Sequence, residues 1–292
     1  MEKTKKVLIT GGGGFIGKHL AELLQSKGYK VAILDRSDKN VPKSIKVFKG
    51  DVRDAKTVAK AMKGMDYVYH LAGLLGTEEL IFNSIEAVDV NVIGALTIMD
   101  AAVKNNTKLV LISKPNPWLN TYSITKEASE KFCIMYQKEF GLKATIVKWF
   151  SVYGPGQKHY GVQKAVPTFI VKALQGEALP VFDKGKQTAD FIFTSDAVRA
   201  TVLVGESPKA EGKIVEIGTG EETTVIDLAK MVLKMTGSKS KIDYLPMRKG
   251  EDKNARVVAD TTMLKKVTNF KPEVDLETGM TETVAFYKKL LA

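Results

Sequence analysis

Short apolar runs alternate with amphipathic stretches of helical periodicity through the first half of the 292-residue chain. The runs occupy residues 7–10, 31–35, 45–48, 67–71, 108–113 and 144–150. Strands buried on both faces of a parallel sheet have this continuous apolar composition, and their alternation with helices indicates a sheet covered on both faces. We therefore predict an α/β fold whose ligand binds at the carboxyl ends of the strands.

The alternation weakens after Ser151, where a Gly-Pro-Gly sequence at residues 154–156 interrupts the chain. Beyond it the pattern predicts a helix over about 166–175, short strands near 190–193 and 213–217, and an amphipathic last helix over about 276–290. We find no internal repeat and no low-complexity linker. We expect a first domain over residues 1–150, to which segments around 188–217 return, and a smaller, interleaved C-terminal domain over residues 151–292.

The first apolar run leads directly into a glycine-rich turn. Gly12, Gly14 and Gly17 have the G-x-G-x-x-G spacing, and Gly11, Gly14 and Gly17 have the looser G-x-x-G-x-x-G spacing. Such glycines permit a tight turn, bring the backbone close to a pyrophosphate and let the helix pack closely on the sheet. The N-terminus of the following helix then faces the phosphates.

The second apolar run ends in Asp35, which lies 21 residues after Gly14. A carboxylate about 20 residues beyond the glycines bonds the adenosine ribose and repels a 2′-phosphate, which favours NAD over NADP. Arg36, the next residue, leaves NADP as an alternative. The two elements together predict a Rossmann-type, doubly wound parallel sheet that binds NAD.

The composition sets broad limits on the class of protein. Hydrophobic residues make up 44% of the chain and charged residues 26%, which is ordinary for a soluble globular protein. No apolar run approaches the roughly 20 residues of a membrane helix, so we expect no membrane partner. The single cysteine, Cys133, excludes an intramolecular disulfide and fits a reducing compartment. We expect a cytoplasmic protein with Cys133 in its core.

The net charge of +11 comes from lysines scattered along amphipathic stretches. A nucleic-acid surface would instead cluster basic residues and interleave aromatic ones. We therefore expect no nucleic-acid partner, and we interpret the charge as attraction for a phosphorylated substrate. The three histidines show no metal-ligand spacing, and we expect no metal.

Five segments together resemble the extended short-chain dehydrogenase/reductases that act on nucleotide sugars, typified by UDP-glucose 4-epimerase. The segments are Thr10–Gly17, Gly50–Asp54, His70–Gly73, Asn91–Gly94 and Tyr122–Lys126. Their order and spacing carry the resemblance, which covers essentially the whole chain. It implies that NAD is held by Gly11, Gly14, Phe15, Ile16, Gly17, Asp35, Arg36, Asp51, Val52, Leu71, Ala72, Gly73, Tyr122 and Lys126.

Tyr122 and Lys126 have the Tyr-x-x-x-Lys spacing of this family. Residues four apart share one face of a helix, so the phenol and the ammonium lie together. The ammonium and a cationic nicotinamide lower the pKa of the tyrosine from about 10. We expect Tyr122 to take a sugar hydroxyl proton while hydride leaves the same carbon. The resemblance also implies a bond from Lys126 to the nicotinamide ribose.

The segment before Tyr122 departs from the family pattern, which has a serine or threonine in a Ser-Ser-Ser-like run and a much longer loop. Ser113 matches the first serine of that run, and Tyr122 follows only 9 residues later. The position of the catalytic hydroxyl falls near Pro115, which has no proton to relay. The role of that hydroxyl falls to Ser113, Asn116 or Thr121, or the tyrosine works without a hydroxyl partner. We assign Ser113 to the catalytic set. The short loop should leave the sugar pocket more open.

The substrate side departs from the family as well. Ser151 stands where an asparagine often contacts the phosphate region, and a simple turn explains it equally well. Ala189 replaces the arginine of an Arg-Asp-Phe/Tyr-Ile strand, so one diphosphate contact is missing. The resemblance implies that Arg248 binds the diphosphate and Glu251 the uridine ribose. Candidates to replace the lost charge are Lys184, Lys186 and Arg256.

Three hypotheses describe the function. The leading one is an NAD-dependent nucleotide-sugar epimerase, acting at C4 of a UDP-hexose and keeping its NAD between turnovers. The second is a ketoreductase, decarboxylase or dehydratase of the same family. The third is an NAD-binding regulatory or assembly protein whose catalytic loop has decayed.

Members of this family often dimerise through two helices, here about 85–104 and 122–140, so we expect a homodimer. One apolar stripe on a helix fits a dimer interface and an intramolecular core equally well. The residues open to both interpretations are Ile93, Leu96, Met99 and Val103.

Overall fold

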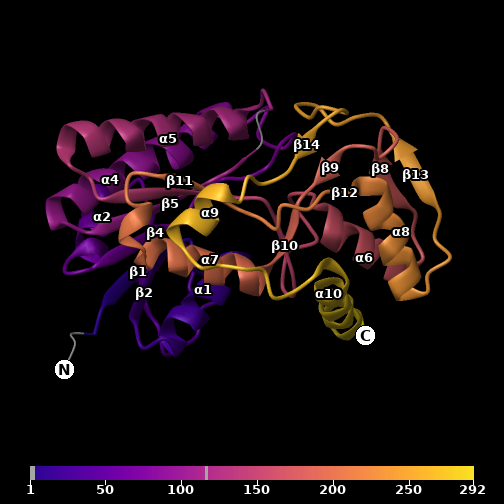
Figure 1. Cartoon of the computed structure of the whole chain (residues 1–292), viewed down its shortest axis with the longest axis horizontal. Helices are drawn as coiled ribbons and strands as arrows, with labels where there is room; N and C mark the ends of the chain where they lie inside the picture. The colour runs from indigo at the N-terminus through magenta and orange to yellow at the C-terminus, as the bar shows by residue number, and fades with distance from the viewer. Residues whose placement is uncertain (1–3, 116–117) are drawn as a thin grey trace.

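The computed structural model describes residues 4–115 and 118–292, and its first part contains a seven-stranded sheet (Figure 1). The strands are β1 (Lys6–Thr10), β2 (Lys30–Asp35), β3 (Lys46–Lys49), β4 (Tyr67–His70), β5 (Lys108–Ser113), β6 (Ala144–Trp149) and β11 (Ile214–Ile217). All are parallel, in the order β3-β2-β1-β4-β5-β6-β11. The order reverses direction between β1 and β4, which is the ligand-binding switch point of a doubly wound sheet. The predicted fold class is confirmed.

Helices cover both faces of the sheet. One face carries α1 (Phe15–Ser26), α7 (Thr194–Glu206) and α9 (Thr262–Val267); the other carries α2 (Ala55–Met62), α4 (Gly94–Asn105) and α5 (Thr121–Phe140). A short helix α3 (Ser84–Val88) and a π-helical turn η1 (Asp89–Ile93) lead into α4. Alternate residues of β1 face opposite layers: Val7 and Ile9 join the core under α1, and Leu8 joins the core under α2 and α4. Burial on both faces explains the unbroken apolar strands in the sequence.

The second part of the chain forms small sheets packed with three helices. Its elements are β7 (Ser151–Tyr153), α6 (Ala165–Gln175), β8 (Leu179–Phe182), β9 (Thr188–Ala189), β10 (Phe191–Phe193), β12 (Thr223–Thr224), α8 (Val225–Thr236), β13 (Ile242–Leu245), β14 (Arg256–Val257) and α10 (Leu276–Leu291). The short 3₁₀ turn η2 (Pro208–Ala210) follows α7 and packs with the large sheet instead. Strand β10 pairs with β7, β13 with β8, and β9 lies between β12 and β14. Helices α6, α8 and α10 pack around one apolar cluster.

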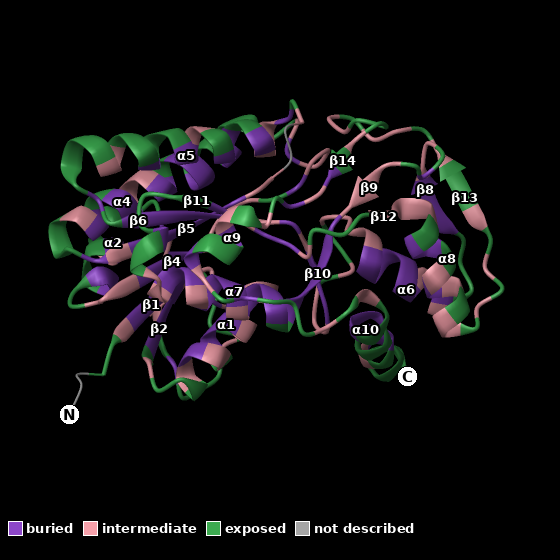
Figure 2. Cartoon of the chain, viewed as in Figure 1, coloured by how far each residue is buried: buried purple, intermediate pink, exposed green. Residues whose placement is uncertain are grey.

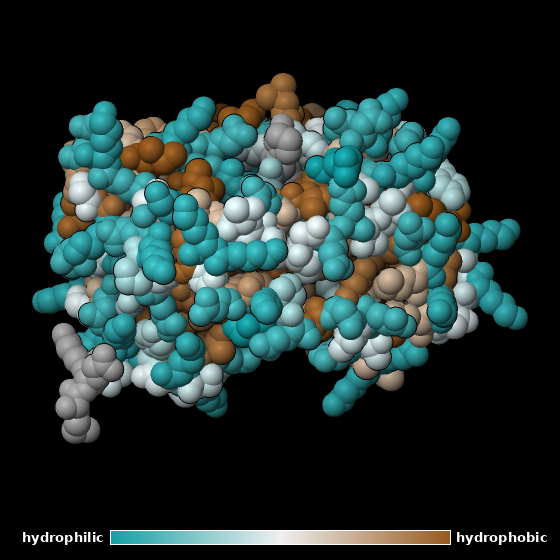
Figure 3. Space-filling model, in the orientation of Figure 1, coloured by the Kyte–Doolittle hydropathy of each residue, from teal (hydrophilic) through white to brown (hydrophobic). Residues whose placement is uncertain are grey.

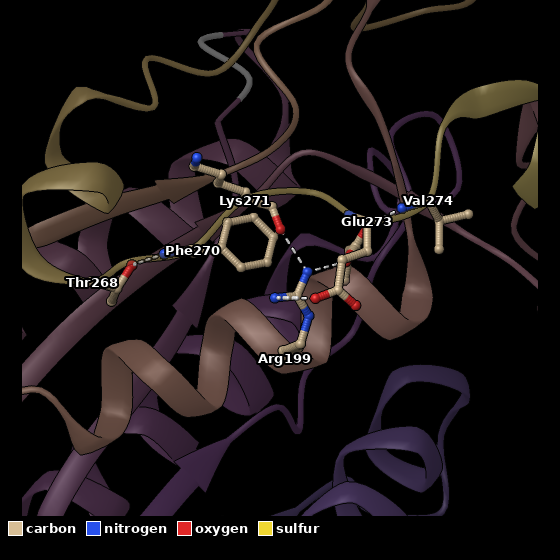
Figure 4. Close-up of polar contacts among 7 residues, drawn as sticks. Arg199, Thr268, Phe270, Lys271, Glu273 and Val274 are labelled. Carbon is tan, nitrogen blue, oxygen red and sulfur yellow. Dashed lines mark hydrogen bonds and ion pairs between the residues drawn. The ribbon is translucent and has the colours of Figure 1, made fainter.

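Strand β11 and helix α7 come from the second half of the sequence, yet they complete the large sheet and its helical layer. The segment between α9 and α10 runs back along α7 toward the second part, and Arg199 fixes it there (Figure 4). Its guanidinium bonds Asp196 (2.6 Å) and the carbonyl of Lys271 (2.6 Å), pairs with Glu273 (3.2 Å), and lies 4.6 Å from the ring centroid of Phe270. The chain thus returns twice to its first part, at α7 to β11 and at α9, before it ends in α10.

The burial pattern follows the layers, with strands inside and the outer faces of the helices exposed (Figure 2). Cys133 is fully buried on α5, as predicted, and burial raises the pKa of its thiol to about 12. Within residues 4–115 and 118–292, no helix is both long and apolar enough to cross a membrane. The division into domains stays a prediction.

Candidate functional site

The glycine turn joins the end of β1 to α1, and its glycines have no side chains to cover the backbone. Gly11 has a φ of +70°, and a Cβ there would lie 2.8 Å from the backbone nitrogen of Ala72. A Cβ on Gly17 would lie 2.5 Å from the carbonyl oxygen of Gly11. Only glycine fits these two positions without moving the backbone. The cradle that results is the space that a pyrophosphate needs at the start of α1, so the residues present fit NAD.

Two carboxylates stand at the ends of the next strands. Asp35, at the end of β2, accepts the N–H groups of Gly13 (3.0 Å) and Ser37 (3.2 Å), which hold it beside the glycine turn. Asp51 follows β3 and receives two hydrogen bonds from the Arg53 guanidinium (2.9 and 2.8 Å), which hold the pKa of Asp51 below its usual value. Each carboxylate keeps free lone pairs for a ribose hydroxyl or an adenine amino group.

Val52 and the segment after β4, both expected to contact NAD, are closely packed against η1 and α4. Val52 is buried, and a Cβ on Gly94 would meet its side chain at 2.7 Å. A Cβ on Gly73 would lie 2.9 Å from Oδ1 of Asn91, since that amide bonds the backbone of residue 74 (2.7 and 2.9 Å). The same amide donates to the Thr125 hydroxyl (3.0 Å) on α5. Asn91 therefore connects the cofactor strand with the helix that carries the tyrosine and the lysine.

Helix α5 brings Tyr122 and Lys126 to these strand ends on one face. Asn120 starts the helix by accepting the N–H of Ser123 (2.9 Å). Lys126 is only 7% exposed, and burial lowers its pKa to about 8 against the opposing charge of Glu130. Burial raises the pKa of Tyr122 to about 12, which differs from the expected lowering. Loss of water around the phenol is the dominant effect in the protein without its ligands, so the phenol is protonated at neutral pH.

Ser113, the assigned catalytic hydroxyl, lies at the end of β5 and is buried. It donates a short hydrogen bond to Glu130, whose other carboxylate oxygen pairs with Lys148 at 3.1 Å. Its hydroxyl is therefore part of a buried polar triad below the site. A catalytic role for Ser113 stays a prediction.

Thr121 and Asn116 are the other two candidates for the missing hydroxyl. Thr121 shares a hydrogen bond with Ser84 (2.8 Å) at the surface. Asn116 lies outside the described residues.

Arg248, expected to hold the diphosphate, is surrounded by carboxylates. Its guanidinium pairs with Glu79 (3.1 Å), Glu251 (3.3 Å) and Glu78 (3.6 Å), and its side chain is only 9% exposed. Burial raises the pKa of Glu251, while Arg248 opposes the rise. The two predicted substrate residues are thus together, but the arginine is shared with a loop that follows β4.

The segment of Arg248 is fixed directly over the start of α5. The side-chain amide of Asn120 donates to the carbonyl of Gly250 (2.9 Å), which has a φ of +74°. A Cβ on Gly250 would lie 2.9 Å from that of Asn120. One residue therefore both begins the catalytic helix and positions the segment expected to bind substrate.

The remaining substrate positions lie on the small sheets. Ser151 begins β7 beside Phe191 of β10, and its N–H donates to the carbonyl of Asp190 (2.9 Å). Ala189 lies on β9. Of the candidates for the missing charge, Lys184 and Lys186 are exposed, and Arg256 is ion-paired with Glu222.

Sequence reasoning missed Asn91, Asn120, Glu79 and Lys114. Asn91 and Asn120 lie within or beside motifs that the sequence did show, so their place in the chain was the available signal. Lys114 directly follows the assigned serine, and its Nζ donates to the hydroxyl of Ser123 (2.7 Å). Glu79 had no local signal, because its partner Arg248 is 169 residues away.

A doubly wound sheet with a bare glycine turn, strand-end carboxylates and a Tyr-Lys pair on one helix face defines an NAD-binding enzyme of the short-chain dehydrogenase/reductase class. The chain belongs to the NAD dependent epimerase/dehydratase family, whose model matches residues 7–218. Its cofactor is therefore NAD, and its family comprises nucleotide-sugar epimerases, dehydratases and decarboxylases.

Several known proteins are similar to the chain over nearly its whole length. The UDP-N-acetyl-alpha-D-glucosaminuronate decarboxylase of Bacillus cytotoxicus is 33% identical over 98% of each chain. The UDP-glucose 4-epimerase of Thermotoga maritima, solved with UDP-glucose, has a TM-score of 0.93 at 28% identity, covering 98% of this chain and 100% of its own. The UDP-glucose 4-epimerase of Thermus thermophilus, solved with NAD, has a TM-score of 0.89 at 27% identity, covering 97% and 99%.

Proposed function

We propose that the protein epimerises a nucleotide sugar, at C4 of a UDP-hexose, by transient oxidation. The observation that carries the proposal is the four-residue spacing of Tyr122 and Lys126 on α5, a helix bonded through Thr125 and Asn91 to the segment after β4. The hydrogen bond between Asn91 and Thr125 supports it, because it fixes that face of the helix to the cofactor strand.

Tyr122 is the group that takes and returns the proton of the C4 hydroxyl. NAD, when bound, accepts the C4 hydride and gives it back. Lys126 places positive charge beside the phenol and so favours loss of its proton, and the Asn91 bond keeps the face of the helix in register with the cofactor. Epimerisation requires the 4-keto sugar to present its opposite face before the hydride returns. The more open pocket expected from the short loop between Ser113 and Tyr122 favours that turn.

A second candidate is the decarboxylation of a UDP-uronic acid. The 33% identical relative named as a decarboxylase supports it. Both reactions begin with the same oxidation at C4. In a uronate the C4 ketone makes the C5 carboxylate a β-keto acid, so the bond from C5 to the carboxyl carbon breaks and carbon dioxide leaves. The electron pair passes to the C4 oxygen as an enolate, C5 then takes up a proton, and the ketone at C4 is reduced by the returning hydride.

The two candidates are separated by incubating the purified protein with UDP-glucose, UDP-N-acetylglucosamine, UDP-glucuronate and UDP-N-acetylglucosaminuronate, without added cofactor. We expect a C4 epimer in the proton NMR spectrum; a pentose nucleotide and carbon dioxide would favour the second candidate. Tyr122→Phe should lower either activity by about 10²-fold or more, whereas Tyr244→Phe, at an exposed tyrosine on β13, should not. Retained NAD with no conversion of any substrate would support the decayed, regulatory protein instead.

We also propose a homodimer formed by the helices around α5. Leu96, Met99 and Val103 pack in the core, but Ile93 is 46% exposed. Further exposed apolar side chains on α3 and α5 are Ile85, Val88, Ile124, Phe132, Ile134 and Met135. Figure 3 shows hydrophobic atoms along the upper edge of the molecule, over α5. Exposed apolar patches of this kind mark protein contacts in soluble proteins.

Light scattering tests the dimer directly. We expect twice the chain mass of 32.0 kDa, and a shift to the single-chain mass in Ile85→Glu. A single-chain mass for the unchanged protein at micromolar concentration would refute the dimer.

A further inference from the structure

The described hydroxyl groups around Tyr122 are all engaged with other partners. Ser113 donates to Glu130, and Thr121 shares a hydrogen bond with Ser84 at the surface (2.8 Å). The Thr125 hydroxyl donates to the backbone carbonyl of Tyr122 (3.0 Å). Within the described ranges, none of these bonds reaches the phenol.

The last neighbouring hydroxyl, that of Ser123, leads to a different side chain. It donates to the amide oxygen of Asn120 (3.2 Å) and accepts from the Lys114 ammonium (2.7 Å). Lys114 is the first residue after β5, so it leaves the sheet next to the strand end where the family carries its hydroxyl run. The bond to Ser123 fixes its ammonium against the first turn of α5.

At this place Lys114 lies on the rings of two aromatic residues. Its Nζ is 5.0 Å from the ring centroid of Tyr122 and 5.5 Å from that of Trp118. These distances are within the range of cation–π contacts. A cation on the ring of a tyrosine is attracted more strongly to the phenolate than to the neutral phenol, because the phenolate carries a full negative charge.

We propose that Lys114 is a positioning residue that replaces the missing hydroxyl, holding positive charge on Tyr122 from the side of β5 while Lys126 holds it along α5. The inference rests on the proposed tyrosine chemistry. It explains how a site with Pro115 in place of a hydroxyl donor keeps a tyrosine able to lose its proton. Two cations on a half-buried phenol oppose the burial that otherwise keeps it protonated.

The charge of Lys114 itself depends on its surroundings. Burial, and to a smaller extent Lys164 just before α6, lowers its pKa to about 7, against the opposing charges of Glu127 on α5 and Glu251 in the segment over α5. The ammonium is therefore about half charged near pH 7, gains charge as the pH falls and loses it as the pH rises.

The test compares Lys114→Met with Lys114→Arg in the NAD-loaded protein. Loss of one nearby charge shifts the pKa of an ionisable group by about one to two units. We therefore expect Lys114→Met to lower kcat/KM at pH 7 by about 10- to 100-fold. The acid limb of the pH profile of kcat/KM should move upward by about one to two pH units. Lys114→Arg should keep the activity at pH 7 and exceed the unchanged protein above it, because arginine retains its charge. Lys63→Met, at an exposed lysine beyond α2, is the matched control and should change neither value.

A second measurement does not depend on turnover. Tyrosine labelled with carbon-13 at Cζ reports the ionisation of Tyr122, with Tyr122→Phe used to identify its signal. We expect the titration of Tyr122 in Lys114→Arg to lie about one to two pH units below that in Lys114→Met, because the arginine keeps its charge at the pH where the phenol ionises. Equal titrations of Tyr122 in the two folded variants would overturn the role of Lys114. If Lys114→Met does not fold, a fall in activity of Lys114→Arg above pH 7 equal to that of the unchanged protein would overturn it. If no nucleotide sugar is converted, the proposed function fails, and the NMR titration still decides the role of the lysine.

Discussion

Asp190 holds together three segments on which the site depends, and its replacement by asparagine is the sharpest stability test that the structure offers. The side chain is fully buried between β9 and β10. One oxygen accepts the N–H (2.8 Å) and the hydroxyl (2.7 Å) of Thr219. The other accepts the N–H groups of Gly220 (2.8 Å) and Ala259 (3.2 Å). The carboxylate thus joins the strand after Ala189 to the loop beyond β11 and to the segment beyond β14.

An asparagine has nearly the same shape as the aspartate but only one oxygen. In either orientation of the amide, its NH₂ group replaces one of the two carboxylate oxygens. The two donors that bonded that oxygen then lose their acceptor. A hydrogen bond to a charged acceptor contributes about 1.5–3 kcal/mol. Loss of two such bonds gives about 3–6 kcal/mol, a large part of the roughly 5–15 kcal/mol that stabilises a typical protein.

Calorimetry of the purified variant measures the effect. For a chain of this size about 1 kcal/mol shifts the melting temperature by roughly 2 °C, so Asp190→Asn should melt about 6–12 °C below the unchanged protein. The control is Asp243→Asn on β13, which makes the same charge change at an exposed position and should leave the melting temperature within about 1 °C. A melting temperature for Asp190→Asn equal to that of the control would refute the reasoning.

Three further predictions concern the cofactor turn, the buried triad and the response to acid. Gly17→Ala places a Cβ 2.5 Å from the carbonyl oxygen of Gly11, so the turn must open, and NAD released on denaturation should fall about 10-fold or more. Lys148→Met leaves the buried Glu130 carboxylate without its cation and should destabilise the protein by about 2–4 kcal/mol in denaturant titrations, with partial recovery when Glu130→Gln is added. Burial and then the charge of Lys126 lower the pKa of His70 to about 3, below the usual 6.5, so the unfolded chain binds the proton first. The free energy of unfolding should therefore fall as the pH drops from about 6.5 toward 3, by up to about 1.4 kcal/mol per unit, and His70→Gln should flatten this dependence.

The sequence predicted the sheet and the cofactor turn because both are local. An apolar run that ends in glycines needs no distant partner to be interpreted, and the strands at 6–10, 30–35 and 108–113 lie within one residue of their expected bounds. The antiparallel and the parallel pairing of β9 are each two residues long, and no periodicity can show in so short a strand. The local sequence pattern therefore predicted the glycine turn and the strands around it, but it could not predict the small sheets.

The direction of individual side chains could not be predicted, because it depends on tertiary partners. Ser113 was assigned from its place after the fifth strand, and its hydroxyl bonds Glu130, which the alignment of motifs did not include. The pKa of Tyr122 was expected to fall beside a lysine and a cationic nicotinamide, and burial raises it in the protein without its cofactor. Arg248 was expected to bind the diphosphate, and three carboxylates pair with it. In each case the motif located the residue, and the fold decided what the residue contacts.

This difference between locating a residue and knowing its contacts explains why the Tyr-Lys pair cannot distinguish an epimerase from a decarboxylase. In both proposed reactions Tyr122 and Lys126 would serve the same oxidation at C4, and the glycine turn would hold NAD in the same way. The outcome depends on what faces C5 and on whether the ketone turns over before it is reduced. We propose that in this chain those contacts come from the segment around Arg248 and from the small sheets, where Ala189 on β9 stands at the position of the family's arginine. Glu78 and Glu79, in the loop after β4, add negative charge beside Arg248. On this proposal a uronate carboxylate has to lie away from those glutamates, and the charge arrangement around Arg248, more than Tyr122 and Lys126, determines which substituent at C5 the site accepts.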